Sequence, residues 1–449
     1  MKTVLIANRG EIALRIVRAC RELGLESVAV YAQGDEDSPH VRFADRALCI
    51  GPAAAAQSYL NVQAVLSAAV GAGADAIHPG YGFLAENPGF AQLCRDCGLT
   101  FVGPSPTAIA NMGNKDRARQ TMAHSGVPVV PGSPGPVEDG KMAKALAAEI
   151  GYPVLLKAAS GGGGKGMRLV EQPDQMERAL SLTRSEAEAA FGDSAVYMEK
   201  FITRPRHVEI QILADNHGSV IHLGERDCSV QRRNQKLVEE APCPVLTEDM
   251  RQQMGDAAVK AARAVDYSGA GTVEFLLDAN GKFYFMEMNT RIQVEHPVTE
   301  MITGIDLVKA QLLVAAGEQL DIIQEDVAFN GWAIECRINA EDPAADFRPS
   351  PGTITRWFAP GGPWVRVDGI ASAGYVVSPH YDSMIAKIIV WGQDREEAIS
   401  RMERALAETV VEGIPTTISL HQQIMADEEF RSGHYDTGLL PRIMERLGR

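Results

Sequence analysis

The sequence predicts a multidomain protein of mixed α/β and α+β class whose first domain is a doubly wound parallel sheet. Three observations support this fold class. The chain has 449 residues, and at about 150 residues per domain it is long enough for roughly three domains. Short β-branched runs alternate with helical patterns near the N-terminus. Farther along, two apolar runs flank an Asn-Gly dipeptide, which is typical of an antiparallel hairpin.

The N-terminal elements are predicted in alternating order. Val4–Ala7 is the first strand, Glu11–Leu23 has apolar residues at helical spacing and stops at Gly24, and Ser27–Tyr31 is the second strand. The same patterns predict further elements at 39–43 (helix), 76–78 (strand), 90–98 (helix) and 100–103 (strand). Strands separated by helices indicate a parallel, Rossmann-like sheet. The first turn, 8–11, has one glycine where a dinucleotide site requires three.

A Pro/Gly cluster at 128–136 marks a boundary or hinge after this domain. A helix is predicted at 141–150 and a strand at 153–157. A third region begins near Trp332 with a strand at 333–337, and it ends in an amphipathic helix over 396–411.

Composition excludes several classes of protein. With 45% hydrophobic and 22% charged residues the chain is globular, and a net charge of −15 disfavours nucleic acid or an anionic membrane as the main partner. No apolar stretch reaches the about 18 residues of a membrane span, and the N-terminal apolar run is too short for a signal peptide. Seven scattered cysteines favour reduced thiols in the cytoplasm, and Cys94-x-x-Cys97 is interpreted as helix packing.

A glycine-rich loop, Gly161-x-Gly163-x-x-Gly166, lies between two predicted strands. It opens no helix and lacks the Lys-Ser/Thr of a Walker A motif, so neither nucleotide fingerprint applies. We expect a flap whose backbone N–H groups close over phosphates, with Lys165 and Arg168 supplying positive charge. Lys157, at the end of the preceding apolar strand, supports an anion at this place. The alternative is a surface hairpin without a ligand.

The Asn280-Gly281 hairpin brings two carboxylates together in the predicted register. A two-residue type I′ turn places Ala279 opposite Lys282 and Glu274 opposite Glu287. Carboxylates in cross-strand register repel and are tolerated best around a cation. The alternative is a pair of exposed glutamates on the solvated face of a sheet.

The residues after this hairpin extend the predicted site. Asn289 follows Glu287 on the same face, and two carboxylates with an amide oxygen suit Mg²⁺ or Mn²⁺. If the chain remains extended, Arg291, Gln293 and Glu295 share this face as well. Arg and Gln suit a planar oxyanion, and Glu295 is a candidate base.

The sequence resembles biotin carboxylases from end to end. The resemblance rests on long motifs at 8–13, 78–84, 161–166, 225–229, 287–298, 339–343 and 381–384. It implies a Rossmann-like (pre-ATP-grasp) N-terminal domain over 1–113, an ATP-grasp domain over 114–330 with a mobile lid at about 131–203, and a mixed β-rich C-terminal domain over 331–449.

The resemblance also implies roles for individual residues. The ATP-binding set comprises Lys115, Lys157, Gly163, Gly164, Glu199, Lys200, Phe201, Ile202, His207, Gln231, Asn234, Glu274 and Glu287. The metal ligands, expected to hold two ions, are Glu274, Glu287 and Asn289. Bicarbonate is assigned to Lys236, Arg291, Gln293 and Val294, and biotin to Tyr81 and Arg337. The catalytic set is Arg291, Glu295, Arg337 and Lys236. Asn234 stands where many members of the family have His.

The activity implied is ATP- and bicarbonate-dependent carboxylation of biotin through carboxyphosphate, the first half-reaction of acetyl-CoA carboxylase in fatty acid synthesis. The chain has no Met-Lys-Met biotinylation motif. We therefore expect it to act on biotin carried by a separate biotin carboxyl carrier protein. The resemblance also implies a homodimer that works with carboxyltransferase subunits. The alternatives are a subunit of another acyl-CoA, pyruvate or urea carboxylase, a different ATP-grasp ligase, and a non-catalytic binding protein of this fold.

Overall fold

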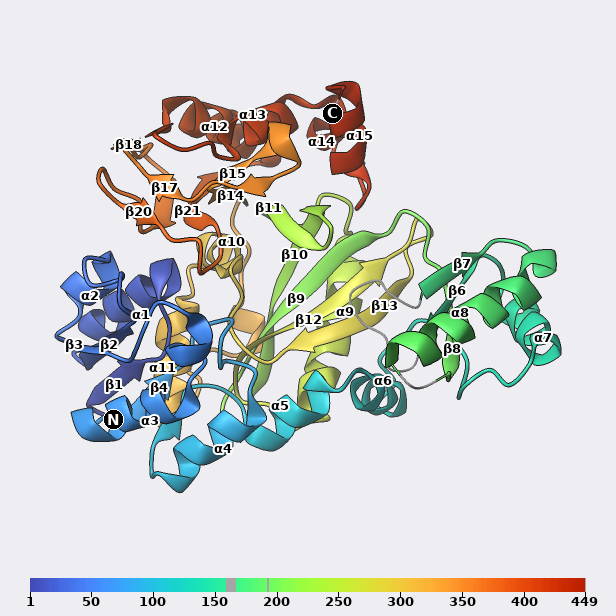
Figure 1. Cartoon of the computed structure of the whole chain (residues 1–449), viewed down its shortest axis with the longest axis horizontal. Helices are drawn as coiled ribbons and strands as arrows, with labels where there is room; N and C mark the ends of the chain where they lie inside the picture. The colour runs from blue at the N-terminus through green and yellow to red at the C-terminus, as the bar shows by residue number, and fades with distance from the viewer. Residues whose placement is uncertain (159–166, 192–193, 449) are drawn as a thin grey trace. The chain divides into compact units, whose positions relative to one another are not determined.

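The computed structural model describes residues 1–158, 167–191 and 194–448 (Figure 1). The chain divides into two compact units. The main unit comprises Met1–Val127, Arg206–Phe275 and Glu287–Arg449, and the small unit comprises Pro128–Pro205 and Leu276–Met286. The predicted domain boundaries stay a prediction, because this division follows packing within each unit.

The N-terminal part of the main unit is a five-stranded parallel sheet, as predicted. Its order is β3(Arg46–Cys49), β2(Glu26–Tyr31), β1(Thr3–Ile6), β4(Ala76–His78) and β5(Thr100–Phe101). The helices of this part are α1(Gly10–Glu22), α2(Pro39–Phe43), α3(Val62–Ala72), α4(Pro88–Asp96), α5(Pro106–Gly113) and α6(Lys115–His124). The elements predicted from periodicity are confirmed, and β3 is an additional, partly exposed strand.

An eight-stranded sheet carries the residues of interest. Its order is β13(Phe283–Asn289), β12(Gly269–Leu277), β9(Arg206–Ala214), β10(Val220–Arg232), β11(Gln235–Ala241), β14(Trp332–Asn339), β21(Met384–Gly392) and β19(Val365–Gly369). Antiparallel pairing of β11 with β14 joins the strands before residue 242 to those after residue 331. Val230, Ile334, Ile388 and Leu420 accordingly belong to one hydrophobic core.

Helices and short strands complete the main unit. The helices are α9(Glu248–Arg263), α10(His296–Thr303), α11(Leu307–Ala315), α12(Arg395–Glu408), α13(Ile418–Ala426), α14(Glu428–Arg431) and α15(Leu439–Arg446). The short strands are β15(Glu341–Asp342), β16(Arg348–Pro349), β17(Gly352–Thr353), β18(Arg356–Phe358), β20(Val376–Val377) and β22(Val410–Glu412). Among the described residues, none of the helices has the length and hydrophobicity needed to cross a bilayer.

The predicted C-terminal helix is wrong at its end. Helix α12 stops at Glu408, and residues 410–412 instead form β22, which pairs with β18. The β-branched run Thr409-Val410-Val411 explains this difference, because such residues favour strands. The chain then continues through three further helices, which can be followed in red in Figure 1.

The small unit contains a three-stranded antiparallel sheet with two helices. Strands β7(Met167–Val170), β6(Val154–Ala158) and β8(Val196–Lys200) pair in that order, and the helices are α7(Gly140–Ile150) and α8(Met176–Phe191). Lys157 lies opposite Met167, so the predicted strands on both sides of the glycine-rich loop are confirmed. The loop glycines, including Gly163 and Gly164, lie outside the described residues.

The turn of the Asn-Gly hairpin also differs from the prediction. The Asp278 N–H donates to the Lys282 carbonyl at 2.8 Å and the Gly281 N–H to the Asp278 carbonyl at 3.1 Å, so three residues lie within the turn. The Asp278 carboxylate accepts from the Asn280 and Lys282 N–H groups, and Gly281 has a φ of 78°. A local carboxylate cap and a left-handed glycine favour this wider turn. Ala279 therefore does not face Lys282, and direct opposition of the two glutamates no longer follows.

Candidate active site

Charged side chains from five segments of the main unit converge on one face of the large sheet. We call this group, which comprises His207, Glu209, Lys236, Glu274, Glu295 and Arg337, the acid–base cluster. Residues 207 and 209 come from β9, where side chains two apart share a face. The others come from β11, β12, β14 and the turn before α10. Tertiary pairing thus gathers residues that lie far apart in the chain.

Lys236 lies at the centre of the acid–base cluster. Its Nζ donates to Glu209 at 2.6 Å, to Glu295 at 2.6 Å and to Glu274 at 3.0 Å. Burial alone would lower the pKa of Lys236, but the three carboxylates outweigh it and raise the pKa well above its usual value. The ammonium is therefore permanently charged, and an incoming anion must compete with carboxylates for it.

Glu295 lies between two cations. One of its oxygens accepts from Lys236 and the other accepts from Arg337 Nη2 at 2.9 Å. Burial opposes ionisation, but Lys236 and Arg337 hold the pKa of Glu295 well below its usual range. Arg337 is itself oriented by Glu239, which accepts from its Nε at 2.6 Å. Glu295 is therefore a carboxylate at neutral pH, the form that a base requires.

Arg226 is a central residue that the sequence reasoning missed except as part of a motif. Its side chain is fully buried and donates to Glu209 at 2.6 Å and to the side-chain amide oxygen of Gln293 at 2.7 Å. Its remaining N–H groups donate to Gln211, Thr299 and Thr272. A charged residue at the middle of the buried strand β10 was the available signal, because such a charge requires partners.

The predicted metal ligands lie at the edge of the acid–base cluster. Glu274 accepts from the side-chain amides of Asn289 at 2.8 Å and Gln293 at 2.7 Å, and His207 Nε2 lies 2.9 Å from its other oxygen. Burial opposes ionisation of Glu274, yet Lys236 and His207 hold its pKa below the usual range. Glu274 is therefore a fixed negative charge.

Glu287 has the electrostatic character expected of a cation ligand. Burial and the nearby Glu274 carboxylate raise its pKa, and its counter-charge is Lys115 Nζ at 4.0 Å. Two carboxylates that disfavour each other's ionisation are stabilised by a divalent cation between them. The donor set of Glu274, Glu287 and Asn289 therefore fits Mg²⁺ or Mn²⁺.

The segment after Asn289 does not remain extended. Strand β13 ends at Asn289, the chain bends, and α10 begins at His296 with Pro297 in its first turn. The predicted common face therefore does not exist as an extended strand. The side chains still converge, because Arg291 Nη2 donates to Asn289 Oδ1 at 2.9 Å and Gln293 bonds Glu274. Arg291 also donates to Glu86 at 2.9 Å, a partner that the sequence did not indicate.

Two further predicted residues lie in the main unit near the hairpin between β10 and β11. Gln231 pairs with Lys236 across these strands, and the two-residue turn is formed by Arg233 and Asn234 with φ of 49° and 68°. Both positive angles are typical of a type I′ turn, which Asn tolerates well. Asn234 is thus exposed at a hairpin tip.

Tyr81 lies close to the acid–base cluster without belonging to it. Its hydroxyl donates to Glu11, and burial together with this carboxylate raises its pKa well above the usual value. Arg337 also acts electrostatically on this hydroxyl. The two residues predicted to contact biotin are therefore neighbours in the main unit.

The predicted nucleotide residues of the small unit are described by themselves. Lys157 Nζ forms an ion pair with Glu199. Lys200 Nζ donates to the carbonyls of Gly151 at 2.7 Å and Tyr152 at 2.9 Å. The backbone N–H groups of Lys200 and Phe201 donate to Pro131 and Pro153, and Ile202 is buried. The run 199–202 is therefore firmly held by its own unit.

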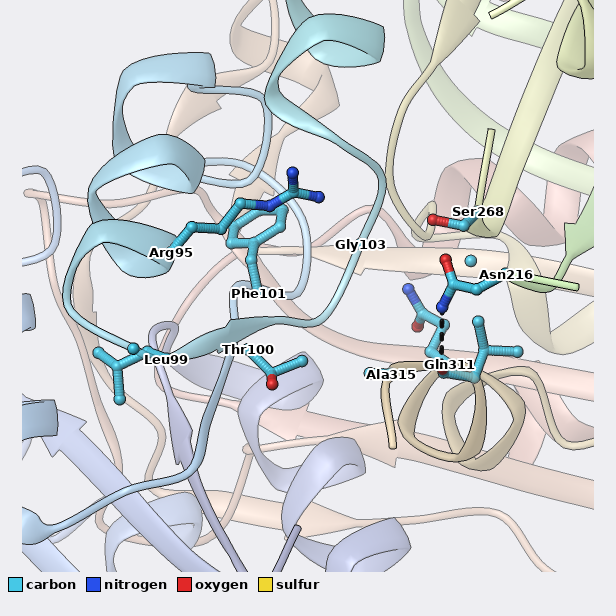
Figure 2. A pocket seen from close by; sticks show the side chains of 12 residues that line it. Arg95, Leu99, Thr100, Phe101, Gly103, Asn216, Ser268, Gln311 and Ala315 are labelled. Carbon is cyan, nitrogen blue, oxygen red and sulfur yellow. Dashed lines mark hydrogen bonds between the residues drawn. The ribbon is translucent and has the colours of Figure 1, made fainter. Parts of the chain in front are cut away.

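A separate polar pocket of about 360 Å³ lies elsewhere in the main unit (Figure 2). Its lining includes Arg95, Ser268 and Gln311, and Asn216 donates to the Val314 carbonyl at 3.2 Å. None of the predicted site residues line it.

Family models match three consecutive parts of the chain. "Biotin carboxylase, N-terminal domain" matches residues 1–109, "Carbamoyl-phosphate synthase L chain, ATP binding domain" matches 114–323, and "Biotin carboxylase C-terminal domain" matches 335–442. These matches define the class of protein, an ATP-grasp ligase whose ATP-binding domain lies between two carboxylase domains.

Similar proteins identify the family within this class. Biotin carboxylase 1 of Bacillus subtilis is 60% identical over 98% of both chains, and a pyruvate carboxylase subunit from Methanothermobacter thermautotrophicus is 55% identical over 97% of this chain and 88% of its own. The solved biotin carboxylase complex with β-γ-ATP from Campylobacter jejuni is 50% identical, with a TM-score of 0.90 over 98% of both chains. The biotin carboxylase domain dimer of Hydrogenobacter thermophilus 2-oxoglutarate carboxylase, solved with MgADP, ADP and bicarbonate, is 52% identical, with a TM-score of 0.89 over 98% of this chain and 97% of that chain.

The chain belongs to the biotin carboxylase family. It is an enzyme, an ATP-dependent ligase, and both the resemblance and the predicted fold class are confirmed.

Proposed function

We propose that this chain carboxylates biotin on a separate carrier protein, with ATP and bicarbonate as co-substrates, as the first half-reaction of an acetyl-CoA carboxylase. The observation that supports it most is the placement of one carboxylate, Glu295, between Lys236 and Arg337. This arrangement offers a base and two cations to small anions at a single point.

The first step makes bicarbonate reactive. Bicarbonate binds at Lys236, Arg291, Gln293 and the Val294 backbone, and Glu295 removes its proton. The resulting oxyanion attacks the γ-phosphorus of ATP, the bond from that phosphorus to the bridging oxygen breaks, and carboxyphosphate and ADP result. The low pKa of Glu295 makes it a weak base by itself, so Lys236 and Arg291 must stabilise the negative charge that develops on bicarbonate.

The second step transfers the carboxyl group. Carboxyphosphate releases CO₂ and phosphate, and the phosphate takes the proton from N1′ of biotin, which then attacks CO₂. Arg337 stabilises the enolate form of the ureido oxygen, and Tyr81 contacts the biotin rings. Arg337 is suited to this role because it is buried, permanently charged and oriented by Glu239.

The metal and nucleotide assignments complete the proposal. Glu274, Glu287 and Asn289 hold Mg²⁺ or Mn²⁺, which neutralises phosphate charge when it is bound. Lys115, His207, Gln231 and Asn234 contact the nucleotide from the main unit. Lys157, Gly163, Gly164 and the run 199–202 are the further nucleotide contacts of this proposal. Seven free cysteines agree with a cytoplasmic enzyme.

The alternative is the biotin carboxylase subunit of another carboxylase. The Methanothermobacter pyruvate carboxylase subunit is 55% identical to this chain, nearly as similar as the 60% identical biotin carboxylase. In both cases the acyl acceptor is chosen by the carboxyltransferase partner. Affinity capture of the biotinylated carrier and its carboxyltransferase subunits distinguishes them, and size-exclusion chromatography with light scattering tests the homodimer.

ATP hydrolysis tests the activity itself. We expect ADP formation that requires bicarbonate and increases on addition of free biotin. A ligase for another substrate would not respond to biotin, and a non-catalytic protein would neither bind Mg-ATP in calorimetry nor release ADP.

A further inference from the structure

A lysine lies in the buried apolar run of β21, where an aliphatic residue would pack more simply. The Lys387 side chain has no exposed surface, and Ile385, Ala386 and Ile388 beside it along the strand are buried. A buried ammonium is costly unless specific partners compensate it. The roles assigned above do not account for this residue.

Lys387 contacts one group next to the residues assigned to bicarbonate and one group next to the tyrosine assigned to biotin. Its Nζ donates to the Val294 carbonyl at 2.6 Å and lies 3.1 Å from Glu11 Oε1. The same Glu11 oxygen accepts from the hydroxyl of Tyr81. One ammonium therefore connects the turn assigned to bicarbonate with the tyrosine assigned to biotin.

Strand register places Lys387 next to Arg337. The two residues are direct partners between β14 and β21, and Asp368 of β19 is the partner on the other side. Directly paired residues point to the same face, so two cations lie side by side. Burial lowers the pKa of Lys387, but Glu11, Glu335 and Asp368 outweigh it and keep the amine charged.

The Val294 carbonyl matters because of the residues that flank it. Gln293 bonds Glu274 and Arg226 on one side, and Glu295 bonds Lys236 and Arg337 on the other. A peptide group is planar, so fixing the carbonyl of Val294 fixes the plane that leads to the Glu295 Cα atom. Between β13 and α10 the segment has no regular secondary structure, so side-chain bonds contribute to holding it.

We propose that Lys387 is a positioning residue, which holds the Gln293–Glu295 turn through the Val294 carbonyl so that Glu295 faces bicarbonate. Glu11 compensates the charge of Lys387 and connects Lys387 to Tyr81. The inference rests on the proposed function, because it concerns how the base of that reaction is oriented.

Two matched variants isolate the bond to Val294. Glu11→Gln removes the charge partner but keeps the Lys387–Val294 bond and an acceptor for Tyr81. The double variant Lys387→Met, Glu11→Gln removes that bond as well, without leaving the Glu11 carboxylate unpaired. We expect kcat/KM for bicarbonate to be roughly ten- to a hundredfold lower in the double variant than in Glu11→Gln, the loss typical of a charged hydrogen bond. The KM for ATP should change by less than about twofold.

A control separates positioning from stability. Arg395→Met removes a part-buried guanidinium that donates to Glu240, and it should lower the melting temperature while leaving KM for bicarbonate unchanged. If Lys387 were only structural, the double variant would behave in the same way, and this result would overturn the proposal.

Lys387→Arg keeps the test decisive if the double variant does not fold. It retains the charge and the donors but displaces them, so KM for bicarbonate should rise above that of the unmodified enzyme, and an unchanged KM would contradict the proposal. Failure of the proposed function can be distinguished from failure of this inference. If the proposed function were wrong, the unmodified enzyme itself would show no ATP hydrolysis stimulated by bicarbonate and biotin.

Discussion

Replacing Arg226 with Met tests whether the buried guanidinium under the acid–base cluster holds the site together. The change removes an ion pair with Glu209 at 2.6 Å and hydrogen bonds to Gln211, Thr299, Thr272 and Gln293, all at a side chain with no exposed surface. Removing one partner of a buried ion pair typically costs about 3–5 kcal/mol.

The arrangement of the cluster places the expected loss near the lower end of that range. Glu209 keeps a second cation, Lys236 Nζ, at 2.6 Å, so only part of its charge compensation is lost. We therefore expect the free energy of unfolding to fall by about 3 kcal/mol.

Urea unfolding followed by tryptophan fluorescence measures this loss. The chain has four tryptophans, and Trp332 lies on β14 in the same sheet as Arg226. The double variant Arg226→Met, Glu209→Gln should recover part of the stability, since it leaves no buried carboxylate at this position. A loss below about 1 kcal/mol for Arg226→Met, with no recovery in the double variant, would refute the assignment of Arg226 as the organising charge.

Three further predictions concern the site and its surroundings. Glu287→Lys should abolish ATP turnover. The circular dichroism spectrum should stay unchanged, because Glu287 is partly exposed and its replacement need not disturb the fold. Biotin-dependent ATP hydrolysis at the normal rate would refute the metal assignment. Glu295→Gln should lower kcat for bicarbonate-dependent ATP hydrolysis by about 10²–10⁴-fold and leave the Kd for Mg-ATP in calorimetry nearly unchanged, and retained kcat would exclude Glu295 as the base. Burial lowers the pKa of His421 from 6.5 to about 4, and its Nε2 lies 2.6 Å from the Arg337 carbonyl. The unfolded chain therefore binds the proton more readily than the folded chain, and the free energy of unfolding should fall as pH drops from about 6.5 to 4, by about 3 kcal/mol at most. Urea titrations at several pH values measure this fall, which should be smaller in His421→Gln.

Much of the local structure follows from the sequence. Alternation of β-branched runs and helical periodicity predicts the parallel N-terminal sheet, and the strands on both sides of the glycine-rich loop are confirmed. These predictions succeed because each depends on the spacing of apolar residues within one element. The motif at 78–84 likewise lies in the part that the biotin carboxylase N-terminal model matches, and the motif at 287–298 in the part that the ATP-binding model matches; each can be read from sequence because it is continuous in the chain.

Turns and chain direction are determined less well by sequence. The Asn280-Gly281 turn is one residue wider than expected because Asp278 caps it, and the chain bends after Asn289. Both differences arise from hydrogen bonds and helix starts that an alternating pattern does not contain. Each of these two differences changes which side chains lie opposite one another.

The sequence by itself determined the residue types of the site, because carboxylates, amides and cations suited to metal, phosphate and bicarbonate stand in recognisable motifs. Only the tertiary structure decided how they meet. Lys236 contacts three carboxylates from three different segments, and Arg226 and Lys387 likewise bond groups that lie far away in the chain. The physical reason is that charge compensation in a buried cluster depends on distances of a few ångströms between atoms far apart in the chain, and the sequence does not contain those distances.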